Sequence, residues 1–329
     1  MWRNVPDKLK ERKQVVIKHL LTSRASSTVK RYILEIRKFF CWCQGFGVEV
    51  QLPFDCVIIA IYLSQCFQQS NSSASLTLVY SAIKWLHTFV PVNNPLDNDF
   101  CRNILESAKR FSGKPVSKKT PLSADIIKLI IDSYAGPQCS LKHLRIATIC
   151  TLGFAGFLRY NELCNILPSH LNFYDTYMTI FIPRSKTDVY REGNIVYINS
   201  VDSKYCPVNL VKKYMKAAGI SFESNLPLFR PLIYYKKSNS YSLRCSKLSY
   251  SRCREVFKSC IKELGLDPKC YGLHSLRSGG ITSVVHHSGN SISDRLLKLH
   301  GRWKTDAAKD MYVHEDVHKR LEITKYLGL

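Results

Sequence analysis

The chain has 329 residues, a length that suits about two domains, and its 48 Lys and Arg against 25 Asp and Glu give a formal net charge of +23. Hydrophobic residues make up 45% and charged residues 22%, an ordinary globular composition that excludes a largely disordered tail. The basic excess is shared, because residues 1–121 hold 18 basic and 8 acidic residues (net +10) and the remainder holds 30 and 17 (net +13). This excess predicts a polyanionic partner, with DNA or RNA ahead of an anionic membrane surface.

The N-terminal segment, residues 1–13, has no apolar core and therefore does not read as a signal peptide. The longest apolar run, residues 56–63, is too short to cross a bilayer. Thirteen cysteines at irregular spacing contain no C-x-x-C pair and no zinc-type Cys/His pattern. We therefore expect a reduced, soluble, intracellular protein without a metal site.

Helical periodicity dominates the first 112 residues. In residues 26–44 the apolar side chains fall on one stripe; Ser26 or Ser27 is a candidate N-cap, and Gly45 marks the end. The four helices predicted here cover residues 26–44, 57–67, 73–89 and 99–111. We expect them to form one compact helical domain over residues 1–112.

Residues 113–121 (GKPVSKKTP) contain two prolines, one glycine and the three lysines Lys114, Lys118 and Lys119, and this composition predicts a basic linker. The second domain, residues 122–329, is predicted to be mainly α-helical with one small β-sheet or hairpin. Its predicted helices are 123–134, 141–157 continuing through 158–164, 207–218, 249–264, 274–286, 294–300 and 306–313. Its predicted strands are 177–183 and 194–199, on either side of a charged turn.

Two pairs of residues in the second domain could carry chemistry. His274 and Arg277, in GLHSLRSGG, share one helix face near an N-terminus, which suits a phosphate, although a surface pair is the more frequent meaning of so short a pattern. Arg159 follows an apolar run and needs a buried partner, for which Glu162 is the candidate; a purely structural ion pair is equally compatible.

Three further residues are weak signals when taken singly. Lys186 lies in a turn, where most lysines are merely solvated. Trp303, in HGRWKTDAA, would usually pack in a core. Tyr312 is one of 18 tyrosines and is expected in a short helix capped by Thr305.

Taken together and in chain order, these residues resemble the active-site signature of the tyrosine recombinases, the family of Cre and phage lambda integrase. The order is Arg, Lys, His-x-x-Arg, Trp and Tyr, with intervals of 27, 88, 3, 26 and 9 residues from Arg159 to Tyr312. GFLRYNEL resembles the family's Arg-x-x-Glu box, and SKT after a strand resembles its lysine-bearing hairpin. HSLRSGGIT and HGRWKTDAAKDMY are most similar to recombinases carried by eukaryotic mobile elements.

The resemblance implies a role for each residue. Tyr312 would be the nucleophile that forms a 3′-phosphotyrosine bond, and Arg159 and Arg277 would bind the phosphate oxygens. Lys186 would protonate the leaving 5′-hydroxyl, and His274 would assist proton transfer from the tyrosine. No metal, ATP or other cofactor is implied.

Trp303 would buttress the site. Many members of the family have histidine at this position, and tryptophan there resembles Cre. His300, three residues earlier, could be mistaken for that residue, but the nine-residue step to the nucleophile favours Trp303. Glu162 would support Arg159.

For the whole chain, the resemblance implies a two-domain, C-shaped clamp on double-stranded DNA, working as a homotetramer on two paired sites through a Holliday junction. Residues 1–112 resemble the core-binding domain, and Lys114, Lys118 and Lys119 would contact DNA. A tail over residues 315–329 would dock on a neighbouring subunit through apolar side chains, which are Val317, Leu321, Ile323 and Leu327. The expected location is intracellular, and nuclear if the source is eukaryotic; no membrane or small-molecule substrate is expected.

Two alternatives stay open at this stage. A type IB topoisomerase shares much of this chemistry, although the N-terminal helical domain and the short tail favour a recombinase. A catalytically inactive DNA-binding protein descended from a recombinase is the other, and the complete set of six residues disfavours it.

Overall fold

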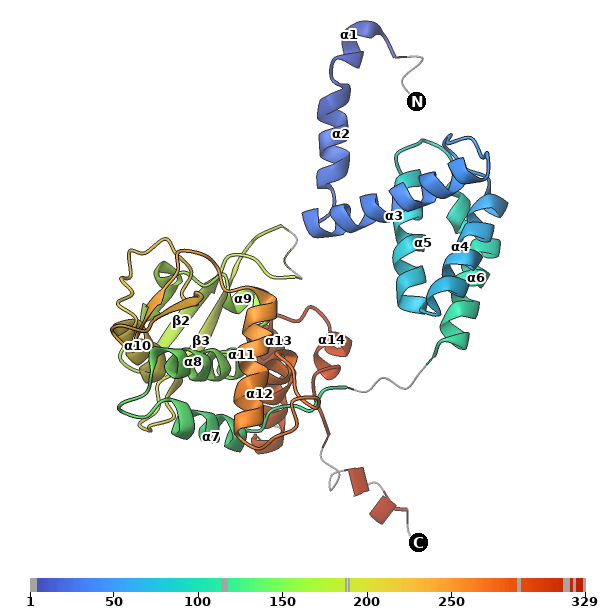
Figure 1. Cartoon of the computed structure of the whole chain (residues 1–329). Helices are drawn as coiled ribbons and strands as arrows, with labels where there is room; N and C mark the ends of the chain where they lie inside the picture. The colour runs from blue at the N-terminus through green and yellow to red at the C-terminus, as the bar shows by residue number, and fades with distance from the viewer. Residues whose placement is uncertain are drawn as a thin grey trace. The chain divides into compact units, whose positions relative to one another are not determined.

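The computed structural model describes residues 5–113, 118–186, 188, 190–288, 291–315, 320–321 and 324–327. The chain divides into two compact units, residues 1–117 and 118–329, which Figure 1 shows in blue to green and in green to red. The division falls inside the segment that its composition predicts to be a linker. Among the described residues, no helix is both long and apolar enough to cross a membrane.

The first unit is entirely helical in its described part. Its helices are α1 (Asp7–Lys10), α2 (Lys13–Thr22), α3 (Ser26–Gly45), α4 (Cys56–Ser70), α5 (Ser73–His87) and α6 (Asp99–Phe111). The four predicted helices are confirmed as α3 to α6. Helices α1 and α2 were not predicted, because they bury no residue and so carry little apolar periodicity.

Helix termini and an aromatic core shape this unit. Asp55 and Ser72 accept hydrogen bonds from backbone N–H groups at the starts of α4 and α5. The expected serine cap of α3 is wrong, since Ala25 occupies the N-cap and makes no side-chain bond. Phe39 is completely buried, and its ring centroid lies 4.8 Å from that of Phe54.

The second unit is built around α8 (Leu141–Ala155), in which every residue from 144 to 153 is buried. The other helices of this unit are α7 (Ala124–Tyr134), α9 (Tyr160–Leu163), α10 (Pro207–Ala217), α11 (Tyr250–Glu263), α12 (His274–His287), α13 (Asp294–Gly301) and α14 (Asp306–Asp310). Helices α7, α10, α11 and α12 contact α8. The mainly helical prediction for this half of the chain is therefore confirmed.

A three-stranded antiparallel sheet packs into the same core. Its strands are β1 (Leu171–Phe173), β2 (Tyr177–Ile182) and β3 (Asn194–Asn199), in that spatial order. Ile180 faces Val196 across β2 and β3, and both side chains are buried. The two longer strands were predicted; β1, with only three residues, is too short to show a period.

A separate two-stranded hairpin, β4 (Leu232–Tyr235) and β5 (Ser240–Leu243), was not predicted. None of its residues is fully buried, and each strand has only four residues, too few to show a clear period.

The predicted helix over residues 141–164 is wrong at one point that matters for the site. α8 stops at Ala155 and α9 starts at Tyr160. Between them Phe157 adopts a left-handed backbone conformation with φ of 46°, and the Leu158 N–H donates to the carbonyl of Gly153 at 3.0 Å. This turn redirects the chain and places Arg159 at the N-cap of α9.

Candidate active site

The six residues of the predicted signature lie on five separate segments of the second unit, and the structure brings them together. Arg159 precedes α9, Lys186 lies in the loop between β2 and β3, His274 and Arg277 belong to α12, Trp303 lies between α13 and α14, and Tyr312 follows α14. The Arg277 Cζ atom lies 4.2 Å from the centroid of the Trp303 ring and 5.0 Å from that of Tyr312. The charges of Arg159, Arg277 and Lys186 all act on His274.

Arg277 is the most enclosed of the six, with none of its surface exposed. Its Nη1 and Nη2 groups donate to the backbone carbonyls of Phe157 and Gly301. Burial and the charges of Arg159 and Arg302 lower the pKa of Arg277 to about 9, so the guanidinium still carries its proton at neutral pH.

Two glycines allow α12 to bring Arg277 this deep. A Cβ on Gly279 would lie 2.0 Å from the carbonyl oxygen of Leu122, and a Cβ on Gly280 would lie 2.3 Å from that of Phe154. The backbones of α12 and its neighbours therefore approach more closely than any side chain permits.

Glu162 binds two arginines at once. Its Oε1 accepts from Nη1 of Arg159 at 2.8 Å, and its Oε2 accepts from Nη2 of Arg302 at 2.8 Å and from the Arg159 backbone N–H at 2.8 Å. Burial alone would raise the pKa of Glu162, but Arg302, the Arg159 backbone bond, and the charges of Arg159 and Arg277 outweigh it and lower the pKa. The predicted Arg159–Glu162 pair is confirmed.

Arg302 is the residue of this network that the sequence did not reveal. It is 5% exposed, has a left-handed φ of 57°, and donates to the carbonyls of Gly156, Phe157 and His300 as well as to Glu162. One signal was available: a residue between Gly301 and a buried Trp303 is itself close to the core, and a buried arginine needs an acceptor.

His274 and Lys186 lie at the exposed side of the cluster. Partial desolvation, followed by the positive charges of Arg277, Arg159 and Lys186, lowers the pKa of His274 below that of an ordinary histidine. The imidazole is therefore neutral, and able to accept a proton, over a wider pH range than usual.

Trp303 and Tyr312 pack together with a ring-centroid separation of 5.4 Å, and both contact a small apolar cluster centred on Phe157 and Ile281. The expectation that Tyr312 lies inside a helix is wrong: α14 ends at Asp310. The predicted Thr305 cap of this helix is confirmed, because its hydroxyl accepts from Ala308 N–H at 3.2 Å.

The backbone around Tyr312 is held by α12. The Thr282 hydroxyl donates to the Tyr312 carbonyl at 3.3 Å and accepts from the His314 N–H at 3.1 Å. His286 Nε2 bonds the carbonyl of His314 at 2.9 Å. The tyrosine segment is thus anchored to the same helix that carries His274 and Arg277.

His300 has a structural place near the cluster. Its Nε2 bonds the Ala155 carbonyl at 2.8 Å, and its ring meets that of Phe157 edge-on at 4.6 Å. Burial lowers the pKa of His300, which keeps the imidazole neutral in this apolar setting.

Of the three linker lysines, Lys118 donates to the Met311 carbonyl at 3.5 Å and Lys119 donates to that of Lys269. Lys114 lies outside the described residues, as do Val317 and Ile323 of the tail. The other two tail residues, Leu321 and Leu327, are 52% and 61% exposed.

The cluster has a clear electrostatic character. The charges of three arginines, Arg159, Arg277 and Arg302, act on Glu162, which is the one carboxylate bonded to these arginines among the described residues, and Lys186 adds a fourth positive charge beside His274. No hydrogen-bond partner is recorded within the described part of the chain for the buried Nε of Arg277. A cation excess with spare donors suits a phosphate, and a tyrosine against it suits nucleophilic attack on that phosphate.

Comparison with known proteins finds similarity to recombinases and integrases. No family model matches the chain. An integrase/recombinase XerD homolog of Selenomonas ruminantium is 28% identical over 302 residues, which cover 91% of this chain and 84% of the relative.

Solved recombinase structures share the fold. The XerH site-specific recombinase, in a post-cleavage complex with its difH substrate, superposes with a TM-score of 0.64 at 16% identity, covering 92% of this chain and 80% of that one. A lambda integrase tetramer bound to a Holliday junction gives 0.53 at 15% identity, covering 88% and 72%. The chain is therefore similar in sequence to an integrase/recombinase over nine-tenths of its length, and it shares the fold of solved tyrosine recombinases and integrases.

Proposed function

We propose that this chain is a site-specific DNA recombinase that cleaves and rejoins duplex DNA through a 3′-phosphotyrosine intermediate and a Holliday junction. The observation that carries the proposal is the position of Arg277, whose guanidinium lies against the rings of both Trp303 and Tyr312 at 4.2 and 5.0 Å. It joins a phosphate-binding cation to a candidate nucleophile in one site.

In the proposed reaction the Tyr312 hydroxyl oxygen attacks the scissile phosphorus, and its proton passes to the neutral imidazole of His274. The bond from phosphorus to the 5′-oxygen breaks, and Lys186 gives that oxygen a proton. Arg159 and Arg277 neutralise the charge that builds on the phosphate oxygens. The phosphotyrosine retains the bond energy, so rejoining to another 5′-hydroxyl needs no further energy source.

The contacts that hold these side chains in place support the roles proposed for them. Glu162 accepts a hydrogen bond from Arg159 and is itself held by Arg302, and Trp303 covers Arg277. Because Arg277 has no exposed surface, a phosphate can reach it only when side chains that cover it, such as the Tyr312 ring, move aside. The bonds that hold this segment, from Thr282 and His286, are side-chain contacts to backbone that such a movement can break.

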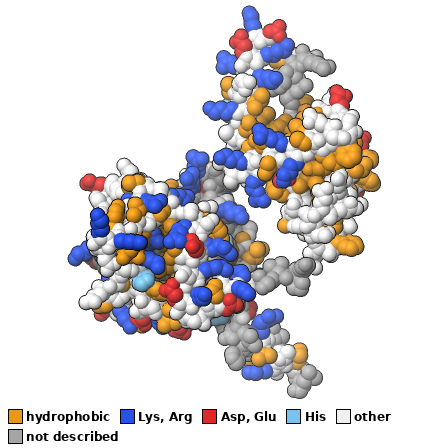
Figure 2. Space-filling model, viewed as in Figure 1, with side chains coloured by type: hydrophobic (Ala, Val, Ile, Leu, Met, Phe, Trp, Pro, Cys, Tyr) orange, Lys and Arg blue, Asp and Glu red, His pale blue; other side chains and the backbone are white. Residues whose placement is uncertain are grey.

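The proposed substrate is double-stranded DNA, gripped from two sides by a C-shaped clamp. Figure 2 shows Lys and Arg side chains spread over the visible face of both units, with fewer Asp and Glu among them. Most of the +23 charge would then provide sequence-independent, salt-sensitive affinity for phosphates. Lys118 and Lys119 remain candidates for DNA contacts, as does Lys114. An intracellular location and a eukaryotic mobile-element origin remain predictions.

The proposed assembly is a homotetramer on two paired sites. An apolar groove of about 990 Å³ lies between β3, α12 and α13 and exposes Ile195, Leu296 and Leu299. It offers a surface on which the tail of a neighbouring subunit, with its exposed Leu321 and Leu327, could dock. Removal of residues 315–329 should therefore preserve single-site cleavage and abolish strand exchange between two duplexes.

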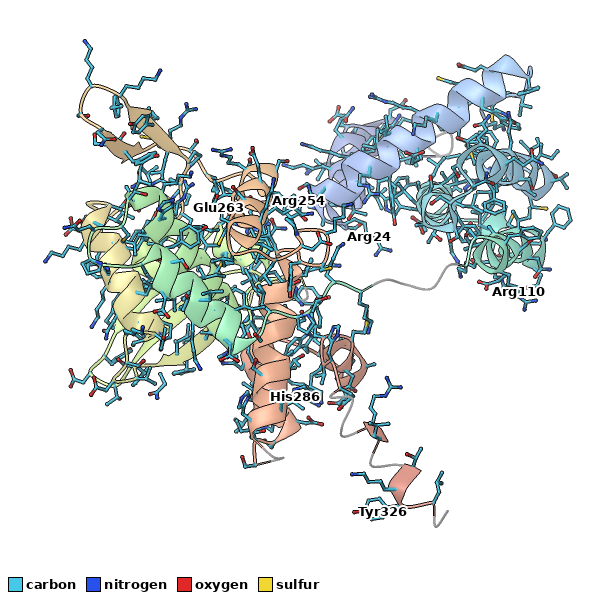
Figure 3. All side chains as sticks on the ribbon, turned by 60° about the horizontal axis from the view of Figure 1, so that its bottom comes forward. Arg24, Arg110, Arg254, Glu263, His286 and Tyr326 are labelled. Carbon is cyan, nitrogen blue, oxygen red and sulfur yellow. The ribbon has the colours of Figure 1, made fainter. Side chains whose placement is uncertain are left out.

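Trapping of the covalent complex tests the proposal. The protein is incubated with a library of nicked, random-sequence duplexes, denatured with detergent, and the DNA attached to protein is sequenced. We expect an adduct that disappears in Tyr312→Phe and persists in Tyr326→Phe, a matched change at a tyrosine that is 88% exposed and is labelled in Figure 3.

The other outcomes select the alternatives. DNA binding without any adduct would support an inactive, recombinase-derived binding protein. Relaxation of supercoiled plasmid without strand exchange would support a type IB topoisomerase. An adduct that survives in Tyr312→Phe would remove Tyr312 from the mechanism.

A further inference from the structure

The β4–β5 hairpin has no fully buried residue and touches the apolar core only through the partly buried Leu243, so its own cross-strand contacts define much of it. Tyr234 lies opposite Tyr241 with ring centroids 5.0 Å apart, a cross-strand pair of the kind that stabilises hairpins. The Tyr234 hydroxyl donates to Oδ1 of Asn239 at 2.8 Å, and Asn239 takes the left-handed φ of 46° that closes the turn. The sequence thus specifies a defined projection with no fully buried side chain in its strands.

The hairpin is firmly attached beside the candidate active site. The carbonyl of Arg230, at its base, accepts from Nη1 of Arg145 in α8 at 2.5 Å. Just after β5, the Leu248 carbonyl accepts from the Tyr160 hydroxyl at 2.5 Å, and Tyr160 is the residue next to Arg159. Figure 3 shows the hairpin standing out from the second unit, with its turn away from the helices.

The segment that contains the hairpin is strongly basic. Residues 224–254 contain no Asp or Glu and seven basic residues, so their net charge is +7. Lys236, Lys237 and Arg244 are exposed, and no ion pair is recorded for them within the described part of the structure. Elsewhere in the unit, exposed lysines such as Lys128 and Lys204 pair with aspartates.

We propose that the β4–β5 hairpin is a DNA-contacting arm, whose Lys236, Lys237 and Arg244 bind phosphates of the duplex outside the bond that is cleaved. The inference rests on the proposed function, which brings a duplex to the site next to α9. Exposed cations without acidic partners can bind DNA phosphates without first breaking an ion pair. The Ser, Asn and Tyr side chains around the turn add hydrogen-bond donors that can reach the DNA backbone. A rigid hairpin holds these groups in one arrangement.

Salt-dependent binding to a duplex is the direct test. The full-length variant Lys236→Ala/Lys237→Ala is compared with Lys128→Ala/Lys204→Ala, which removes the same charge from ion-paired positions. The hairpin variant should bind duplex DNA more weakly, and the slope of log K against log salt should become shallower by about 0.9 for each phosphate that the variant no longer neutralises. The control variant should keep the parental slope.

Adduct formation separates this inference from the proposed function. With the DNA saturated at low salt, the hairpin variant should form as much covalent adduct per bound complex as the parent, because the hairpin does not contact Tyr312. If the parent forms an adduct but both variants bind DNA with the parental slope, the arm is refuted. A changed self-association with unchanged DNA binding would also refute it and assign the hairpin to contacts between copies. If the parent forms no adduct while the hairpin variant alone loses affinity, the arm stands and the recombinase proposal fails.

Discussion

Arg302 and Glu162 form an ion pair with a distance of 2.8 Å between Nη2 and Oε2, and each side chain is only 2% exposed. Glu162 also binds Arg159, so one buried carboxylate compensates two guanidinium groups. A buried ion pair becomes strongly destabilising when one partner is removed, because the other charge is left without compensation in a region of low dielectric. The network therefore stabilises the fold and also fixes the position of Arg159 in the proposed phosphate site.

A double-mutant cycle should reveal the coupling. Glu162→Gln and Arg302→Gln should each lower the free energy of unfolding by roughly 3–5 kcal/mol, with Glu162→Gln the more costly because it leaves two arginines uncompensated. The double variant should lose less than the sum of the two. Urea unfolding measures all four proteins, and strict additivity would mean that the pair does not act as a unit.

Arg277→Lys should retain a positive charge and lose the fork that bridges the carbonyls of Phe157 and Gly301. We expect the rate of covalent adduct formation to fall by about 10²–10³, the range for removal of one fixed donor to a transition-state oxyanion. Arg254→Lys, at an exposed position on α11 in Figure 3, serves as the matched control and should cleave at the parental rate. DNA affinity and circular dichroism check that the Arg277 variant is folded.

The titration of His274 should report the cations around it. Its pKa is lowered by desolvation and by the charges of Arg277, Arg159 and Lys186, so in the DNA-free protein the imidazole should take up its proton below about pH 6.5, the ordinary value. Lys186→Ala removes one positive charge and should move the titration toward higher pH. Lys204→Ala should leave it unchanged. Histidine NMR measures the midpoint, and a downward shift in Lys186→Ala would contradict the proximity of the two residues.

Gly279→Ala should loosen the contact between α12 and the start of the second unit. Its Cβ would lie 2.0 Å from the carbonyl oxygen of Leu122, a backbone atom that cannot rotate away. We expect a loss of roughly 1–3 kcal/mol in the free energy of unfolding, as for other overpacked cores. Gly136→Ala has nothing within 4 Å of the added Cβ and should stay within about 0.5 kcal/mol of the parent. Equal stability of the two variants would count against the close packing of α12.

Most of the secondary-structure elements could be predicted from local patterns in the sequence. The long helices α3 and α8 have an apolar stripe or a long apolar run that can be recognised without knowledge of their partners. The elements that were missed depend on their surroundings. β1 forms because β2 lies beside it, and the β4–β5 hairpin is held by cross-strand contacts and by its base, with no buried face to mark it.

In the candidate site, too, some features could be predicted from the sequence and others depend on the tertiary surroundings. Residue type and order were sufficient to select Arg159, Lys186, His274, Arg277, Trp303 and Tyr312. The break between α8 and α9 was not visible, because apolar periodicity continues across it while the left-handed turn at Phe157 is stabilised by arginines far along the chain. Arg302 was missed for the same reason, since its acceptors lie some 140 residues earlier.

The amino-acid sequence by itself therefore determined most of the helices, the shared basic charge and the choice of the six candidate site residues, because each depends on composition, on local periodicity or on the order of residue types along the chain. Tertiary structure alone decided that these residues meet, that Arg277 lies buried beneath Trp303 and Tyr312, and that Glu162 is shared between Arg159 and Arg302. Those contacts join segments far apart in the chain, and only the packing of α12 and the turn before α9 around a common core brings them within bonding distance.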